Sequence, residues 1–418
     1  MTAEHVPRDP VGNDVDGNGS ASSAAEILAR ARAVAPLLRE RAGEIERDRR
    51  LPADVVEMLR GTGVFRMTFG RNWGGPELNS MEQTEVIEAL SYGDTGAGWC
   101  AMIGSDSGLY AQFLDESVAK EMFTSLDMVT AGLLFPTGRA ERVPGGYRLS
   151  GRWPFGSGIT HADWVISGAF IYRDGQPEPG PDGDPHDSKL FFVPRADVEV
   201  VDTWHSTGLA GSGSCDYTID DVYVPDGRTV TFDTVRNGAG PLAQPEVHMR
   251  NMPGVPLGVA RAALDHVGDT VAGRVGPTSR SIADDYRTQV VLAECEADYA
   301  ATRHAVYAAL RRQHEVLAAG GALDDLSPRE RAALPLSRWH AFRTARSIVT
   351  RLYDLLQTAS IYRRSPMDRW LRDTTTMCQH VVAQERILQS AGAYLLGGTP
   401  SFALSLGVIR PGGAGRRA

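Results

Sequence analysis

The stretch Gly145–Gly158 reads GGYRLSGRWPFGSG and marks the middle of the chain as β structure. Trp153, Phe155 and Ser157 alternate along it, and alternate side chains of a strand share one face. Two aromatic rings and a hydroxyl on one face suit the stacking and hydrogen bonding of a flat heterocycle. The same pattern is typical of a sheet core whose glycines form turns, so both interpretations remain open at this point.

The β pattern extends on both sides of this stretch. From about 129 to 230, short runs rich in β-branched and aromatic residues alternate with turn residues. The segment 173–188 holds four prolines and predicts an exposed loop between two strands. We therefore expect a small β domain over 126–235.

Helical spacing of apolar residues flanks the β domain. Residues 24–125 are predicted to be helical, and Pro36 is expected to kink or split the first helix. Over 236–398, four amphipathic segments predict an antiparallel bundle. These segments are 259–271, 282–319, 337–362 and 366–396. The fold class expected is mainly α with a central β domain.

The two ends of the chain carry no pattern of this kind. Residues 1–23 are polar and rich in Gly, Asn and Asp, which predicts a disordered tail. Residues 399–418 have no strong periodicity and are assigned as a second tail.

Composition excludes several classes of protein. The chain has 418 residues and a formal net charge of −9, so it lacks the basic field that binding to nucleic acid or an anionic membrane requires. No apolar run approaches the roughly 18 residues of a membrane span, and the N-terminus lacks the order of a signal peptide. The four cysteines form no C-x-x-C pair, which predicts a cytoplasmic location and no metal site.

Motifs exclude further activities. The sequence has no G-x-S-x-G nucleophile elbow, no P-loop lysine and no H-E-x-x-H zinc helix. Gly211 and Gly213 lack the third glycine of a dinucleotide-binding fingerprint and lie between predicted strands. A redox cofactor would therefore be held by another architecture.

A second glycine-rich stretch, Trp204–Ser214, reads WHSTGLAGSGS. Small hydroxyl residues among glycines line a cleft closely, and a tight loop uses the same residues. The stretch alone does not decide between the two.

The last helical segment carries the candidate acid–base group. Asp373, Met377, His380 and Gln384 follow one another at spacings of four, three and four, which predicts one helix face. A histidine among apolar neighbours is typical of a satisfied core residue, whereas one beside a polar cleft suits acid–base catalysis near neutral pH.

Taken in order, these segments resemble the acyl-CoA dehydrogenase superfamily, whose chains run from a helical domain through a β-barrel-like domain to a C-terminal four-helix bundle. The chain is most similar to the flavin-dependent monooxygenase branch, which includes two-component aromatic hydroxylases and nitrososynthase-like N-oxygenases of amino sugars. The similar stretches are LPAD from Leu51, GVFR from Gly63, GW at Gly98, PTGRA from Pro136, GYRLSGRWPFGSG from Gly146 and QH at Gln379.

The resemblance implies the chemistry of a two-component monooxygenase. Reduced FMN or FAD comes from a separate flavin reductase, O2 is the co-substrate, and a C4a-hydroperoxyflavin hydroxylates an aromatic or polycyclic natural product. Such a site has to exclude water, and Trp99, Trp153 and Phe155 are the candidate walls of the flavin. The superfamily takes part of its flavin site from a neighbouring subunit, which implies a homotetramer.

The resemblance also assigns roles to polar residues. Ser157, followed by Gly158, matches the hydroxyl of the family's W-x-F-x-S-G stretch and is expected at the flavin N5 edge. His380 is expected to deprotonate a phenol or to keep the distal peroxide oxygen protonated. Arg280 is the candidate for the flavin phosphate.

Alternatives to hydroxylation remain within the same scaffold. An amino-sugar N-oxygenase, an acyl-CoA dehydrogenase or oxidase, and a non-catalytic helical assembly protein are each compatible with the fold. Against the acyl-CoA alternative, Leu134–Gly138 reads LFPTG where dehydrogenases have approximately T-E-P-x-x-G-S-D. The late Glu-Gly-Thr-like loop that often supplies their catalytic base has no counterpart either.

Overall fold

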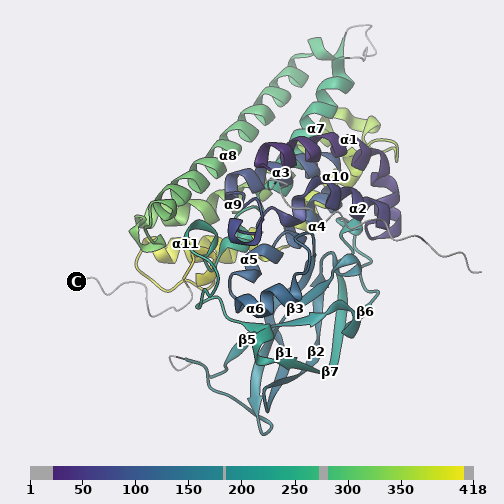
Figure 1. The fold of residues 1–418 in the computed structure, drawn as a ribbon. Coiled ribbons are helices and arrows are strands. Elements are labelled where there is room, and N and C mark those ends of the chain that lie inside the picture. The colour runs from purple at the N-terminus through teal and green to yellow at the C-terminus, as the bar shows by residue number, and fades with distance from the viewer. Residues whose placement is uncertain (1–21, 182–184, 273–280, 409–418) are drawn as a thin grey trace, which may run out of the picture.

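The computed structural model describes residues 22–181, 185–272 and 281–408, and in these ranges helices flank a central sheet (Figure 1). The helices before the sheet are α1 (Ala24–Asp48), α2 (Ala53–Thr62), α3 (Ser80–Gly93), α4 (Thr95–Gly104), α5 (Ser107–Ala111) and α6 (Glu116–Met122). Those after it are α7 (Gly254–Ala272), α8 (Tyr286–Ala318), α9 (Pro328–Leu356), α10 (Met367–Met377) and α11 (Glu385–Leu395). The predicted fold class, mainly α with a central β domain, is confirmed.

The sheet lies at the end of the molecule opposite α8 (Figure 1). Its strands are β1 (Thr130–Val143), β2 (Gly146–Gly156), β3 (Trp164–Arg173), β4 (Gln176–Pro177), β5 (Ser188–Pro194), β6 (Glu199–Val201), β7 (Cys215–Pro225) and β8 (Thr229–Val230). They are arranged in the order β6-β7-β2-β1-β3-β5-β8, with β4 paired to β3. β1 and β3 run parallel, whereas β2 is antiparallel to both β1 and β7.

The helices from the two ends of the chain share one hydrophobic core. α1 packs on α3, α3 on α7, and α7, α8, α10 and α11 on α9. One buried cluster includes Ile27, Leu90, Val259, Phe342 and Met377, which come from α1, α3, α7, α9 and α10. The β domain has a separate core. Side chains of the N-terminal helices, the β domain and the C-terminal helices meet at the junction between the helices and the sheet.

Of the kink or split expected at Pro36, the split does not occur. α1 continues through Pro36 for 25 residues, from a capping box between Ser23 and Glu26 to Asp48. Pro36 is exposed, while Ala31 and Leu38 on the other face are fully buried. Burial of that face outweighs the hydrogen bond that the proline removes.

The predicted helix over 366–396 is interrupted. α10 ends at Met377, a short 3-10 helix η13 (Val381–Ala383) follows, and α11 begins only at Glu385. Residues 399–408 also make contacts that the sequence pattern did not indicate, because Arg331 Nε donates to the carbonyl of Leu406, which is buried.

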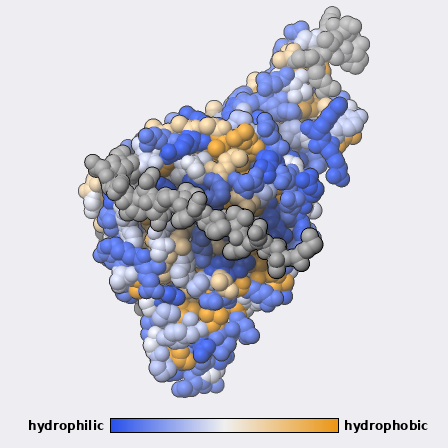
Figure 2. Space-filling model, turned by 45° about the vertical axis from the view of Figure 1, so that its right-hand side comes forward, coloured by the Kyte–Doolittle hydropathy of each residue, from blue (hydrophilic) through white to orange (hydrophobic). Residues whose placement is uncertain are grey.

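The surface is mixed in character. On the face shown in Figure 2, hydrophobic side chains are interspersed with hydrophilic ones over both the helices and the sheet. None of the helices in the described ranges is long and apolar enough to cross a membrane.

Candidate functional site

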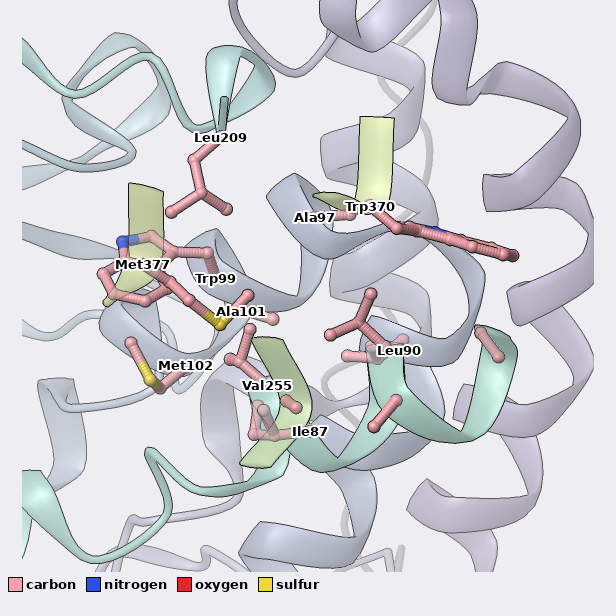
Figure 3. Close-up of a cluster of buried hydrophobic side chains, with 14 of the residues drawn as sticks. Ile87, Leu90, Ala97, Trp99, Ala101, Met102, Leu209, Val255, Trp370 and Met377 are labelled. Atoms are coloured by element: carbon pink, nitrogen blue, oxygen red, sulfur yellow. The ribbon is translucent and has the colours of Figure 1, made fainter. Parts of the chain in front are cut away.

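Four of the predicted site residues, Trp99, Ser157, Gly158 and His380, lie where the helical core meets the end of β2. α4 supplies Trp99, which lies in the same buried cluster as Leu209 and Met377. Figure 3 shows these three side chains close together, although they come from the N-terminal helices, the β domain and α10. The junction therefore joins all three parts of the chain.

A chain of buried hydroxyls crosses this junction. Trp99 Nε1 donates to Ser157 Oγ over 3.0 Å, and Ser157 Oγ is 2.7 Å from Ser214 Oγ. Ser214 Oγ is 2.7 Å from Ser212 Oγ, which donates to the carbonyl of Leu209 over 2.7 Å. Linked hydroxyls polarise one another and can reverse their donor and acceptor roles when a ligand arrives.

The backbone around Ser157 is fixed by a glycine turn. Gly158 has φ +75°, a conformation that L side chains rarely adopt, and its N–H donates to the carbonyl of Ser212 over 2.9 Å. A Cβ at Gly158 would lie 3.2 Å from His161 Nε2. Gly158 thus brings Ser157 to the 212–214 loop and sets His161 directly behind it.

The 209–214 loop is held from the bundle side by Asp373. Its Oδ1 accepts from the N–H of Leu209 over 2.6 Å, and Leu209 has φ +52°. Burial raises the pKa of Asp373 to about 7, although its bond to Leu209 acts in the opposite direction. Asp373 therefore positions the serines from a distance.

Trp153 and Phe155 do not share a face, which corrects the prediction from alternation. Trp153 is 0% exposed, stacks on Tyr217 at 5.5 Å between ring centroids, and donates from Nε1 to the carbonyl of Gly168. Phe155 is 59% exposed and has φ +62°. The register of β2 against β7 shifts between Trp153 and Gly156, and this irregularity breaks the alternation.

Trp153 is thus part of the β core and presents no face to a ligand. Phe155 is the aromatic residue of this stretch that is open to one. A bulky residue at positive φ is strained, and such strain is often retained where a side chain has to be aimed at a ligand.

His380 lies beside Trp99, but not on the helix face predicted for it. It has an extended backbone and caps η13, and its Nδ1 accepts a long bond of 3.5 Å from the N–H of Val382. Its imidazole meets the indole of Trp99 edge to face, with centroids 5.3 Å apart. Burial, with a smaller contribution from Arg338, lowers the pKa of His380 to about 4, so the ring is neutral at pH 7. A neutral imidazole is able to accept a proton.

The junction has groups that a planar heterocycle requires. Phe155 offers an exposed ring and Ser157 a hydroxyl, and both ring nitrogens of His161 are buried with no partner among the residues that the structure describes. Burial lowers the pKa of His161 to about 4, so one of these nitrogens is available as an acceptor and the other as a donor. These residues fit an isoalloxazine ring.

The structure does not test the residue that was predicted to bind the flavin phosphate. Arg280 lies outside the described residues. No group of three or more potential metal ligands occurs in the ranges that the structure describes.

A pocket of about 290 Å³ lies apart from the junction. Gly70, Gln112 and Asn237 are among the residues that line it, and Glu77 is the one titratable residue among its described lining residues.

Sequence reasoning missed several residues of the junction. Ser212 and Ser214 lie in the stretch of small hydroxyls and glycines, which was the signal for them. His161 follows the β2 stretch but had no distinguishing spacing. Arg338 and His248, whose charge and ring lie near His380, carried no signal, because an arginine in an amphipathic helix is ordinarily a surface residue.

Comparison with known proteins gives a consistent result. Residues 24–122 match the family model of the acyl-CoA dehydrogenase N-terminal domain, and residues 253–385 match that of the C-terminal domain. The chain is 32% identical over 370 residues to an indole-3-acetate monooxygenase of Pseudomonas putida, covering 87% of this chain and 91% of the relative. It is 32% identical over 289 residues to the oxygenase component of an FADH(2)-dependent resorcinol hydroxylase of Rhizobium sp., covering 65% and 69%. The crystal structure of the 3-HSA hydroxylase from Rhodococcus sp. RHA1 superimposes with a TM-score of 0.82 at 25% identity, over 91% of this chain and 98% of that one.

Proposed function

Because this chain belongs to the acyl-CoA dehydrogenase family, among its flavin-dependent monooxygenases, we propose that it hydroxylates an aromatic ring with reduced flavin and O2. The observation that carries the proposal is the Trp99–Ser157–His380 junction in a chain whose relatives are named monooxygenases and hydroxylases. The relatives' names support hydroxylation over acyl-CoA oxidation.

The cofactor is reduced FMN or FAD. The resorcinol hydroxylase relative is named as an FADH(2)-dependent oxygenase component, so a separate flavin reductase is the partner that supplies the cofactor. When bound, the reduced flavin supplies the electrons that activate O2 for transfer of one oxygen atom to the substrate.

We assign the chain's own residues to binding and to exclusion of water. Phe155 packs against the flavin ring, and Ser157 hydrogen-bonds the edge of that ring while Trp99 and Ser214 hold its hydroxyl in place. Trp99 and Met377 are buried and keep water from the reacting atoms, which limits loss of the activated oxygen as peroxide.

His380 acts on the substrate. As a neutral imidazole beside Trp99, it accepts a hydrogen bond from the O–H of a phenol or the N–H of a heterocycle, which raises the electron density of the ring carbon that is attacked. Because its pKa is about 4, its acceptor nitrogen stays unprotonated and free for this hydrogen bond throughout the neutral pH range.

A homotetramer formed through the bundle is part of the proposal. Tyr286, Ile361 and Leu396 are large apolar side chains that are more than half exposed, and they lie on or beside bundle helices. Large apolar side chains mark contact surfaces between subunits where they form one contiguous patch, and the proposal requires this of these three residues.

The test is transfer of labelled oxygen. The full chain is supplied with a flavin reductase, NADH, FMN or FAD and a panel of phenols and indoles under 18O2. We expect products that carry one 18O atom, detected by mass spectrometry. Reduced flavin that is oxidised without labelled product from any aromatic compound would contradict the proposal, and anaerobic bleaching of bound oxidised flavin by an acyl-CoA would favour dehydrogenation.

A further inference from the structure

The side chain of Arg338 in α9 is buried, and most of its N–H donors have no hydrogen-bond partner among the described residues. It is 0% exposed, and its Nη1 donates to the carbonyl of Met249 over 3.1 Å. Within the described part of the chain, its Nε and Nη2 have no partner. No carboxylate among the described residues lies within 4 Å of this guanidinium, and burying a charge without a partner is costly.

The two unpartnered groups form one edge of the guanidinium. Nε–H and Nη2–H point in the same direction, and this edge fits the two oxygens of a carboxylate. The same chain shows this pairing at Arg142, whose Nε and Nη2 bind the two oxygens of Glu178 over 3.1 and 3.0 Å. Arg338 presents the same edge without the carboxylate.

The buried groups around Arg338 carry one excess positive charge. Arg250 is paired with Glu246 over 2.6 Å, and Glu246 also accepts from Gln313. Burial acts to raise the pKa of Glu246, but Arg250 outweighs it and the net shift is downward, so Glu246 is ionised at neutral pH. One carboxylate therefore faces two guanidinium groups.

Neither histidine of this cluster adds charge or removes it. Burial is the main cause that lowers the pKa of His248 and of His380 to about 4. Burial also lowers the pKa of Arg338 to about 10, and Glu246 opposes that shift, so Arg338 remains protonated at pH 7. A single negative charge would neutralise the cluster.

Arg338 belongs to the surroundings of His380. Phe342, one turn after Arg338 in α9, accepts from Cys378 Sγ over 3.3 Å, and Arg343 Nη2 donates to Ala383 over 2.6 Å, so α9 runs along the 378–383 segment. On its other side, Arg338 is bonded to Met249 next to His248, whose Nδ1 is buried and has no partner in the described ranges. The ring of His248 stacks on Phe232 at 5.3 Å.

We propose that the unoccupied edge of Arg338 binds the carboxylate of a monoanionic aromatic acid and so selects the substrate. This inference rests on the proposed function, because it places the ring of that acid beside His380. The charge count favours a monoanion over a phosphate ester or a nucleoside diphosphate, which bring two or more negative charges. Arg338 is thus a specificity-determining residue.

The test compares acids with their neutral amides. The probes are benzoate and benzamide, phenylacetate and phenylacetamide, and indole-3-acetate and indole-3-acetamide, titrated calorimetrically into the full chain at pH 7.5 and 0.15 M salt, with and without FMN. In at least one pair we expect the acid to bind about 10-fold or more tightly than the amide. Equal binding in every pair, or no binding of any acid, would overturn the proposal.

Variants locate the preference. Arg338→Gln is expected to reduce the ratio of the acid's affinity to the amide's affinity to below about 3-fold. Arg338→Lys is expected to give an intermediate ratio, because lysine keeps the charge but lacks the two parallel N–H donors of the guanidinium. Arg329→Gln removes an exposed arginine of the same helix and is expected to leave the ratio unchanged. Should Arg338→Gln not fold, as judged by circular dichroism, the Arg338→Lys titration decides.

An unchanged ratio in Arg338→Lys, or an equal loss in Arg329→Gln, would overturn the proposal. So would a loss of FMN affinity in the Arg338 variants with the ratio retained, because Arg338 would then contact the flavin. These titrations need neither turnover nor O2, so they are able to fail while labelled oxygen is still transferred, and the reverse also holds.

Discussion

The indole of Trp99 contacts the imidazole of His380 edge to face, with ring centroids 5.3 Å apart, and donates from Nε1 to Ser157. One side chain of α4 therefore touches both the end of the β domain and the segment after α10. The residues proposed to bind flavin and those proposed to act on the substrate are fixed relative to each other through Trp99. Substitutions of Ser157 or His380 are therefore expected to affect the coupling of flavin oxidation to hydroxylation more than the stability of the fold.

Ser157→Ala removes the centre of the hydroxyl chain. Trp99 Nε1 and Ser214 each lose a partner, so we expect more peroxide and less product per reduced flavin oxidised, with a loss of stability of about 1 kcal/mol. Peroxide is measured with peroxidase after mixing the reduced-flavin complex with O2. Ser347→Ala, at an exposed position in α9, is the matched control. Coupling equal to that of the wild-type protein would argue against a role for Ser157.

His380→Ala removes the proposed hydrogen-bond acceptor for the substrate. General acid–base groups commonly contribute about 100-fold or more, so we expect product per flavin oxidised to fall by at least 10-fold, while binding of FMN persists. In the wild-type protein, the yield of product per flavin oxidised should be constant from pH 6 to 8 and should fall only as the pH approaches 4. The reason is that the lowered pKa of His380 keeps its ring neutral above that pH. His304→Ala changes an exposed histidine of α8 and serves as control. Wild-type product yield in His380→Ala would refute the assignment.

The sequence predicts the arrangement of helices and sheet better than it predicts the site. Helical periodicity on both sides of β2 is a property of many residues, and one irregularity such as Pro36 does not change it. The placement of Phe155 depends on a single positive φ and a register shift, which alternation cannot reveal.

The same distinction applies to His380 and Arg338. His380 reaches the site although α10 ends before it, because a short cap turns the chain back toward Trp99. Spacing assumes a continuous helix and therefore gives the wrong face. Arg338 is identified only when its neighbours are known, since its burial depends on packing between distant segments.

Asp373→Asn tests how the bundle holds the 209–214 loop. The folded-state pKa of about 7 lies above the ordinary value, so in the wild-type protein Asp373 costs stability as pH rises from about 4 to 7. Asparagine keeps an oxygen for the N–H of Leu209 and carries no charge. At pH 8 we expect the variant to be more stable by a few kcal/mol, and at pH 4.5 to match the wild-type protein within about 1 kcal/mol.

Urea denaturation at the two pH values measures this difference. Asp354→Asn, at an exposed position in α9, should show no pH-dependent gain. If Asp373→Asn gained no more stability at pH 8 than at pH 4.5, burial would not raise the pKa of Asp373. The coupling assay on the same variant should change little, because the contact with Leu209 is retained.

Gly208→Ala tests the close approach of the same loop to α10. A Cβ at Gly208 would lie 2.3 Å from the carbonyl oxygen of Arg372 and 2.7 Å from the nitrogen of Asp373, and both are backbone atoms that cannot rotate away. We expect a loss of stability of about 1–3 kcal/mol and increased release of peroxide, because the loop has to move and carries Ser212 and Ser214 with it.

Gly43→Ala is the matched control for that substitution. Gly43 is exposed within α1, near its C-terminal end, and nothing lies within 4 Å of the added Cβ, so alanine should stabilise the helix by about 0.5–1 kcal/mol and leave coupling unchanged. If urea denaturation and the peroxide assay gave the same result for both variants, the packing of Gly208 against α10 would not be what positions the serines.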